Sequence, residues 1–237
     1  MQSIKKRILG KPWNDITKEL HDKGFIVVKN MLTPNECQAL IANYNEGEIY
    51  RKTINMERYR FGKGEYKYYQ YPLPEIINEL REGIYPKIAP VANQWMQELG
   101  LENRFPLIHP EMKQLCHDKE QMKPAILILK YAPGDFNTLH QDLYGEVYFP
   151  MQTVFMLNEI HQDYEGGEFV ITEQIPRAQS KVNVLTPSLG DMVILTTNFR
   201  PVKGTKGYYR VSMKHGVSPL HSGARFSLGI IFHDALS

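Results

Sequence analysis

Cysteine is scarce in this 237-residue sequence, which has only Cys37 and Cys116. Neither thiol sits in a metal-binding spacing, and a chain of this length can bury a sizeable core without disulfides. We therefore expect two reduced, buried thiols in a cytoplasmic protein. Long apolar runs are also missing. No stretch approaches the roughly 20 residues of a membrane span, and the N-terminus lacks the apolar run of a signal peptide.

An excess of one charge is absent as well. The chain has 28 Lys and Arg against 26 Asp and Glu, a formal net charge of +2. Bulk charge therefore gives no argument for a nucleic-acid-binding protein. The hydrophobic fraction of 42% is ordinary for a globular protein, and the length suits one integrated domain.

The hydrophobic pattern changes character near residue 124. Upstream it is mainly helical: Thr33-Pro34-Asn35-Glu36 has the form of a capping box, and residues 74–99 repeat apolar side chains at helical spacing. Pro86 and Pro90 are expected to break or kink that second helix. Residues 25–30 favour a strand. Downstream, short strands separated by turn residues are expected at 125–131, 148–158, 167–172, 181–185, 191–197, 208–213 and 225–232.

This arrangement predicts an α+β fold. Many short strands at such spacing are typical of a β-sandwich or barrel, including the jelly roll. We expect residues 124–237 to form the strand-rich core and residues 1–123 to form a mainly helical support packed against one face of a sheet.

The best metal-site candidate is His140-Gln141-Asp142, which follows an apolar strand and a loop. In extended backbone, residues two apart point to the same side, so His140 and Asp142 can bind one ion. His215, near the end of another expected strand, can supply a third ligand. Two histidines and one carboxylate on one face of the metal, with the other positions open, is the ligand set of non-haem Fe(II) oxygenases.

Spacing alone is weak support for this site because two other His-x-acid pairs occur. His109-Pro110-Glu111 fits a helix start, where proline and an acid in the first turn have structural roles. His161-Gln162-Asp163 fits a solvated loop. We expect neither pair to bind metal.

Arg225-Phe226-Ser227, ten residues after His215, adds a second feature. Arg225 opens an otherwise apolar strand, where an unpaired charge would be costly. Its guanidinium can bind a carboxylate through two hydrogen bonds, and the Ser227 hydroxyl can add a third. This is the chemistry needed to hold the distal carboxylate of 2-oxoglutarate while its keto-acid end binds iron.

These motifs together resemble those of the 2-oxoglutarate/Fe(II) dioxygenases. The resemblance spans residues 131–232 and includes Gly166-Gly167-Glu168-Phe169 and His215-Gly216-Val217. It implies a double-stranded β-helix, a requirement for Fe(II), 2-oxoglutarate and O₂, and a role for Tyr131 as a phenolic partner of 2-oxoglutarate. A buried core tyrosine is the alternative reading of Tyr131.

Over most of its length the chain also resembles a bacterial family of predicted oxygenases proposed to act on alkylated DNA. Residues 61–68, 139–146, 166–169 and 228–234 carry that resemblance. In addition, residues 58–71 hold four basic and six aromatic side chains against one acid, a composition suited to phosphates and exposed bases. The candidate substrate contacts are Arg60, Lys63, Tyr66, Lys67 and Tyr68; Gly64, between them, has no side chain to offer.

A second basic stretch has no acid between Met192 and His233 but contains Arg200, Lys203, Lys206, Arg210, Lys214 and Arg225. It predicts a positively charged rim around the site. Such a rim could bind single-stranded or damaged nucleic acid, or it could only attract anionic 2-oxoglutarate. Alkylated-base demethylases carry Arg-x-Asn-x-Thr-x-Arg where this chain has Ser227, Gly229 and Ile231, so the base-facing arginine is missing. Hydroxylation of a protein or peptide side chain, of the prolyl type, therefore stays open. A non-catalytic, cupin-like binding module is the other alternative.

Overall fold

The computed structural model describes residues 3–143 and 145–236. Its helices are α1 (Ile4–Leu9), α2 (Trp13–Lys23), α3 (Pro34–Ala42), α4 (Glu75–Glu98) and α5 (His109–His117), with short 3-10 turns η1 (Asn43–Asn45), η2 (Gly47–Ile49) and η3 (Met56–Tyr59). The strands are β1 (Phe25–Val28), β2 (Tyr50–Asn55), β3 (Gly62–Lys63), β4 (Glu65–Tyr69), β5 (Lys123–Tyr131), β6 (Phe136–His140), β7 (Met151–Met156), β8 (Tyr164–Gly166), β9 (Phe169–Gln174), β10 (Lys181–Leu185), β11 (Met192–Thr196), β12 (Phe199–Gly204), β13 (Gly207–Val217), β14 (Leu220–Gly223) and β15 (Arg225–Ala235).

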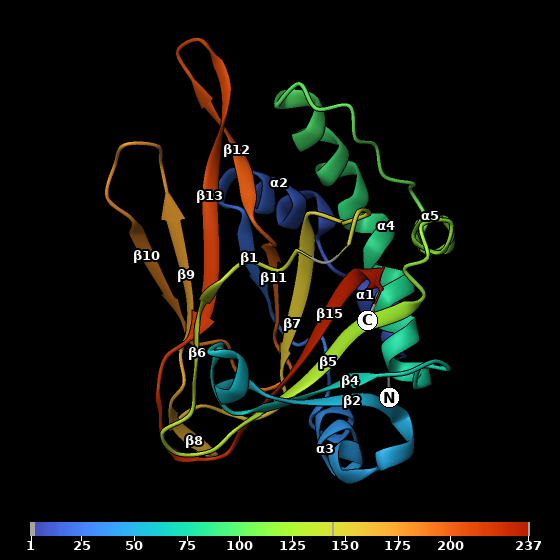
Figure 1. The fold of residues 1–237 in the computed structure, drawn as a ribbon, viewed down its shortest axis with the longest axis vertical. Helices are drawn as coiled ribbons and strands as arrows, with labels where there is room; N and C mark the ends of the chain where they lie inside the picture. Colours follow the sequence, from blue (N-terminus) through green and yellow to red (C-terminus); the bar gives the residue numbers. More distant parts are fainter. Residues whose placement is uncertain (1–2, 144, 237) are drawn as a thin grey trace.

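Two antiparallel sheets form the core of the fold. The larger runs β1-β11-β7-β15-β5-β4-β2, and the smaller runs β10-β9-β13-β6-β3, with β12 paired to β13. Helices α1, α2, α4 and α5 lie on one side of the larger sheet, and the smaller sheet lies on its other side (Figure 1). The predicted α+β jelly roll with a helical layer is confirmed.

Strand alternation gives the larger sheet two different apolar faces. In β15, Leu228, Ile230 and Phe232 pack into the helix-side core. Arg225, Ser227 and Gly229 point the other way and line a cavity between the sheets. Strands β5 and β7 alternate in the same manner. One face therefore anchors the helices while the other presents polar groups to the cavity.

The N-terminal half contributes more strand than expected. Strand β1 pairs with β11 as the residue 25–30 pattern predicts, but β2 and β4 also extend the large sheet, and β3 joins the small one. The expected break in the helix at residues 74–99 is wrong: α4 is one helix with Pro86 and Pro90 inside it. The reason is packing. Pro90 is exposed and Pro86 only half-buried, while apolar side chains along the opposite face, such as Ile84 and Ile88, are fully buried.

Two predictions of absence bear on the fold. Both cysteines are free and buried, as expected: Cys37 lies in α3 and Cys116 in α5. In the described part of the chain, the helices are all too short or too polar to span a membrane.

Candidate metal and co-substrate site

The structure brings the three predicted metal ligands together from two strands and a loop. His140 ends β6, Asp142 follows it, and His215 lies directly opposite His140 on β13. One nitrogen or oxygen of each lies within 4.8 Å of the others. His215 Nε2 is 3.2 Å from Asp142 Oδ2, and His140 Nε2 is 3.6 Å from Asp142 Oδ1. With metal–ligand distances of about 2.0–2.2 Å, ligands on adjacent octahedral positions would be about 3 Å apart. The geometry therefore suits one metal ion.

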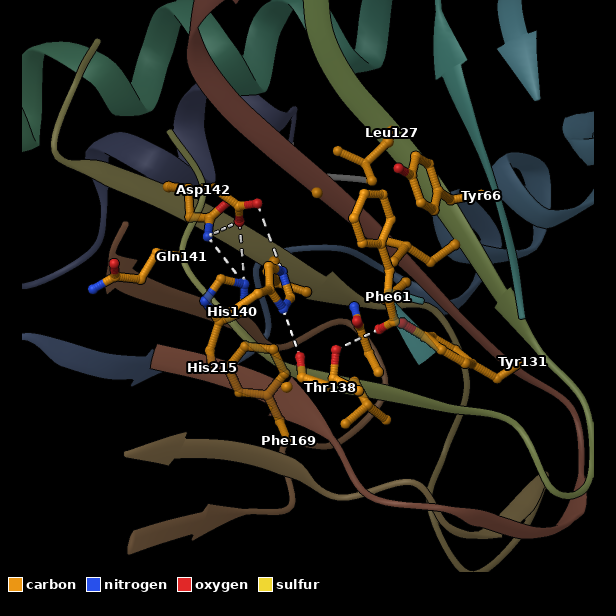
Figure 2. Close-up of a pocket in the computed structure, with 18 of the residues that line it drawn as sticks. Phe61, Tyr66, Leu127, Tyr131, Thr138, His140, Gln141, Asp142, Phe169 and His215 are labelled. Carbon is orange, nitrogen blue, oxygen red and sulfur yellow. Dashed lines mark hydrogen bonds and ion pairs between the residues drawn. The ribbon is translucent and has the colours of Figure 1, made fainter. Parts of the chain in front are cut away.

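Backbone contacts fix the orientation of His140. Its Nδ1 is 2.8 Å from the carbonyl oxygen of Thr138, so Nδ1 carries the proton and donates to that oxygen. The lone pair of Nε2 then faces Asp142 and His215 (Figure 2). This is the usual way in which a second contact selects the metal-binding tautomer.

Asp142 is held as a carboxylate. Burial alone would raise its pKa, but hydrogen bonding and charge from His215, the charge of His140 and the amide of Gln152 outweigh burial and lower it. Gln152 Nε2 donates to Asp142 Oδ2 at 2.7 Å. Burial, and then the charge of His215, lower the pKa of His140. An ionised carboxylate beside a neutral imidazole is the protonation state that binds a divalent cation.

Arg225 is buried deep in the same cavity. Only 1% of it is exposed, and its guanidinium carbon is 5.4 Å from the centre of the Tyr131 ring. Nη1 donates to Ser227 Oγ at 3.3 Å, whereas Nε has no hydrogen-bond partner in the described part of the chain. Within residues 3–143 and 145–236 no carboxylate forms a salt bridge with it. A buried cation with unused hydrogen-bond donors is costly, and a bound anion would offset that cost by pairing with it.

Tyr131 pairs with Arg225 across strands β5 and β15. Its hydroxyl is also buried, with no hydrogen-bond partner among the described residues, and burial raises its pKa to about 12, so it is a neutral donor. The metal triad, Arg225, Ser227 and Tyr131 all line one cavity of about 230 Å³. In Figure 2 the triad lies at one end of the cavity and Tyr131 at the other. A small dicarboxylate can therefore reach the metal with one end and Arg225 with the other.

The other two His-x-acid pairs lie elsewhere. His109 is buried at the start of α5, where its Nε2 is 3.0 Å from the carbonyl oxygen of Phe232. His161 is exposed and pairs with Glu165 at 2.8 Å. Asp163 accepts a hydrogen bond from the backbone N–H of Glu159. Each has a structural role, as expected.

The predicted substrate residues divide between two faces of β4. Tyr66 lines the cavity. Lys67 points to the opposite face, where its Nζ donates to the carbonyl of Tyr44, and Tyr68 is only 8% exposed beneath the Arg51 guanidinium. Lys67 is thus half-buried and Tyr68 buried, so a substrate role for either one stays a prediction.

Arg60 and Lys63 are exposed on the segment that precedes Gly64, on either side of the cavity-lining Phe61 in the sequence. Lys63 Nζ is 3.7 Å from Asp135. Arg60 takes a left-handed backbone conformation with φ of 59°. Both residues are exposed, whereas Lys67 is half-buried.

Much of the basic stretch over residues 200–214 lies away from the metal, whereas Lys214 is exposed beside His215. These residues form the β12–β13 hairpin, which projects away from the rest of the molecule (Figure 1). Lys206, at its tip, is nine residues from His215, or about 30 Å at roughly 3.3 Å per strand residue. Arg200 is paired with Glu173 at 3.0 Å.

Gln152 and Phe61 are among the cavity residues that sequence reasoning did not assign. Gln152 is a buried amide in the largely apolar strand β7, and a large polar side chain in such a strand is a usable signal. Phe61 lines the cavity from the β3 side. Its neighbourhood was identified, but no pattern distinguishes it from the tyrosines that follow.

Comparison with known proteins agrees with this geometry. A family model described as "Oxygenase, catalysing oxidative methylation of damaged DNA" matches residues 64–235. An uncharacterised protein of Mycobacterium tuberculosis, found in strains CDC 1551 and H37Rv, is 42% identical over 164 residues, 69% of this chain and 70% of its own.

Solved structures share the fold at low identity. A Pseudomonas putida prolyl-4-hydroxylase aligns with a TM-score of 0.57 and 16% identity, covering 94% of this chain and 100% of that one. A 2OG-Fe(II) oxygenase family oxidoreductase from Burkholderia pseudomallei aligns with a TM-score of 0.56 and 14% identity, covering 95% and 94%.

Proposed function

Since the chain belongs to the oxygenase family described as catalysing oxidative methylation of damaged DNA, we propose that its cavity uses Fe(II) and 2-oxoglutarate to oxidise a C–H bond of an alkylated nucleic acid. One observation carries the proposal. A complete two-histidine, one-carboxylate triad shares a small cavity with a buried arginine that has no anionic partner among the described residues. The non-catalytic binding module is set aside because the family is enzymatic.

The donor set fits Fe(II). His140, Asp142 and His215 offer two neutral nitrogens and one carboxylate oxygen on one side of the metal, which leaves positions for a chelating co-substrate and O₂. Gln152 holds the carboxylate and Thr138 holds the first imidazole, so the ligands are oriented before the metal arrives.

The remaining polar groups fit 2-oxoglutarate. Its distal carboxylate would accept hydrogen bonds from the Arg225 guanidinium, including the unused Nε, and from the hydroxyls of Ser227 and Tyr131. Apolar residues of the larger sheet, Leu129 and Val154 among them, line the cavity and exclude water from it. The protein thus anchors and desolvates the co-substrate with residues that need not move.

Bound Fe(II) supplies the redox chemistry by which O₂ is divided between 2-oxoglutarate, giving succinate and CO₂, and a substrate C–H bond, giving an alcohol. On an N-methyl group the product is an N-hydroxymethyl, which loses formaldehyde and leaves N–H. Oxygen insertion therefore removes such a methyl group. The chain's own contribution is to hold the reacting carbon near the triad, on the side of the cavity lined by Phe61, Tyr66 and Leu127 (Figure 2).

A substrate panel tests this proposal. Methylated oligonucleotides, proline-containing peptides and free metabolites are each incubated with enzyme, Fe(II), 2-oxoglutarate and O₂, and succinate and formaldehyde are quantified. We expect matched succinate and formaldehyde only with a methylated oligonucleotide. Succinate stimulated by a peptide, without formaldehyde, would favour the prolyl-type side-chain hydroxylase and overturn the nucleic-acid substrate.

A further inference from the structure

Two exposed aromatic rings stand beside the cavity. Tyr59 is 52% exposed and Phe61 is 48% exposed, and their rings stack with centroids 5.5 Å apart and planes 17° apart. Phe61 also lines the cavity that holds the metal triad. The pair therefore runs from the outer surface to the cavity. The matched family region begins at residue 64, after both rings.

The segment that carries the rings is tied to the metal-binding strand. The carbonyl oxygen of Phe61 accepts hydrogen bonds from both the backbone N–H and the hydroxyl of Thr138, at 2.9 and 2.7 Å. Strand β3 pairs with β6. Gly62 permits this approach, because its φ is 134° and a Cβ there would be 2.3 Å from the carbonyl oxygen of Phe136. The backbone at Phe61 is thus held in place before any partner binds, which limits the entropy lost on binding.

The cavity is too small to hold much of a substrate. Its volume of about 230 Å³ is shared with 2-oxoglutarate, and pockets that enclose a whole small ligand usually measure about 300–1,000 Å³. Only the reacting part of a substrate can enter, so the adjoining part must be held at the mouth. The exposed face of the Tyr59–Phe61 pair is the aromatic surface at that position.

Positive charge on the segment that carries the rings favours an anionic partner. Arg58 and Arg60 flank Tyr59, and both are exposed. Lys63 forms an ion pair with Asp135. In the described part of the chain, no salt bridge involves either arginine. Stacked aromatic rings with adjacent cations are the surface that single-stranded nucleic acids use: bases stack on the rings, and phosphates meet the cations. A proline-containing peptide would use the rings but has no need of the arginines.

We infer that Tyr59 and Phe61 form a stacking platform for the unpaired base next to the target nucleotide, with Arg58 and Arg60 on the phosphates. This inference rests on the proposed function because it takes the substrate to be nucleic acid. It also requires single-stranded or flipped-out substrate, since paired bases present no free face to a ring.

Binding of a fluorescein-labelled oligothymidine to the full chain tests the platform, and no iron is added so that binding is measured apart from turnover. We expect Tyr59→Leu and Phe61→Leu each to weaken binding, by roughly 5- to 150-fold per lost stack, at both about 50 and about 200 mM salt. Log affinity falls with log salt, and Arg58→Gln and Arg60→Gln should each make that fall shallower, by about 0.7 in the magnitude of the slope. A 2-aminopurine placed in the oligonucleotide should lose fluorescence on binding to the parent and keep it with Tyr59→Leu.

The matched control is Tyr208→Leu, an exposed tyrosine on the projecting β12–β13 hairpin. It should bind like the parent. Parental affinity in both ring variants, or loss of affinity in Tyr208→Leu alone, would overturn the platform, as would a parent that does not bind the oligonucleotide.

The two proposals can fail separately. Platform-dependent binding without succinate formation on any substrate would leave the platform standing and refute the oxygenase chemistry. Succinate formation with a methylated oligonucleotide whose affinity is unchanged in both ring variants would support the oxygenase chemistry and refute the platform. Binding of a proline-containing peptide that depends on Tyr59, with no oligonucleotide binding, would assign the rings to a peptide and overturn the inference.

Discussion

Replacing Arg225 with methionine should abolish tight 2-oxoglutarate binding without unfolding the protein. Methionine fills much of the same volume but offers no donors. Arg225 is 1% exposed and has no carboxylate partner among the described residues, so the ligand-free protein buries an uncompensated charge. Removing that charge should leave the ligand-free variant at least as stable as the parent.

The magnitude follows from the contacts. Losing a buried, charge-assisted pair costs about 2–5 kcal/mol, or roughly 30- to 5,000-fold in the dissociation constant for 2-oxoglutarate. At a ligand concentration about 100 times its dissociation constant, the parent gains about 2.7 kcal/mol of stability. That corresponds to a rise of roughly 5–11 °C in Tm at about 2–4 °C per kcal/mol. At the same concentration, a variant weakened 30-fold gains only about 0.9 kcal/mol.

Thermal melts with Mn(II) in place of Fe(II), with and without 2-oxoglutarate, measure this directly. Arg210→Met is the matched control, since Arg210 lies on the projecting hairpin above the Phe199 ring. It should show the full parental shift. A parental shift in Arg225→Met would refute the assignment of the anchor, and a ligand-free Arg225→Met that melts several degrees below the parent would refute the uncompensated charge.

Three further predictions concern the metal ligands, acid stability and a loop. Gln152→Leu should weaken Mn(II) binding roughly 10- to 100-fold in equilibrium dialysis, because the metal-binding carboxylate loses its amide partner; unchanged affinity would assign Gln152 a packing role only. Burial lowers the pKa of His109 to about 3 and of His233 to about 4, from an ordinary 6.5. The unfolded chain therefore takes up these protons first, and the free energy of unfolding should fall from about pH 6.5 towards pH 4 by about 1.4 kcal/mol per pH unit for each histidine; a flat urea-unfolding series would contradict this. Asp163→Ala should cost about 1 kcal/mol by urea unfolding, because the Glu159 N–H loses its acceptor, and exposed His161→Ala should be neutral.

The candidate site could be predicted from sequence because its residues follow strand geometry. His140 and Asp142 are two apart near a strand end, and Arg225 and Ser227 share one face of β15. Residues two apart in a strand point to the same side whatever the rest of the fold is, so this relation can be predicted from sequence alone. His215 came from the ligand chemistry, since two ligands from one segment require a third from elsewhere.

Other features depended on tertiary contacts that no local pattern encodes. Lys67 and Tyr68 have the composition of a binding surface, but pairing of β4 with β5 turns one towards Tyr44 and leaves the other beneath Arg51. Pro86 lies inside one continuous helix because burial of the opposite face outweighs a lost hydrogen bond. Local propensity fails where packing decides.

Anaerobic titration of Fe(II) and 2-oxoglutarate, followed by the visible charge-transfer band of the chelate, tests the central claim most directly. The parent should develop the band and saturate at one Fe(II) and one 2-oxoglutarate per chain. His215→Ala should not develop it, because two remaining ligands hold the metal weakly. Absence of the band in the parent, or an undiminished band in His215→Ala, would contradict an Fe(II)/2-oxoglutarate centre at His140, Asp142 and His215.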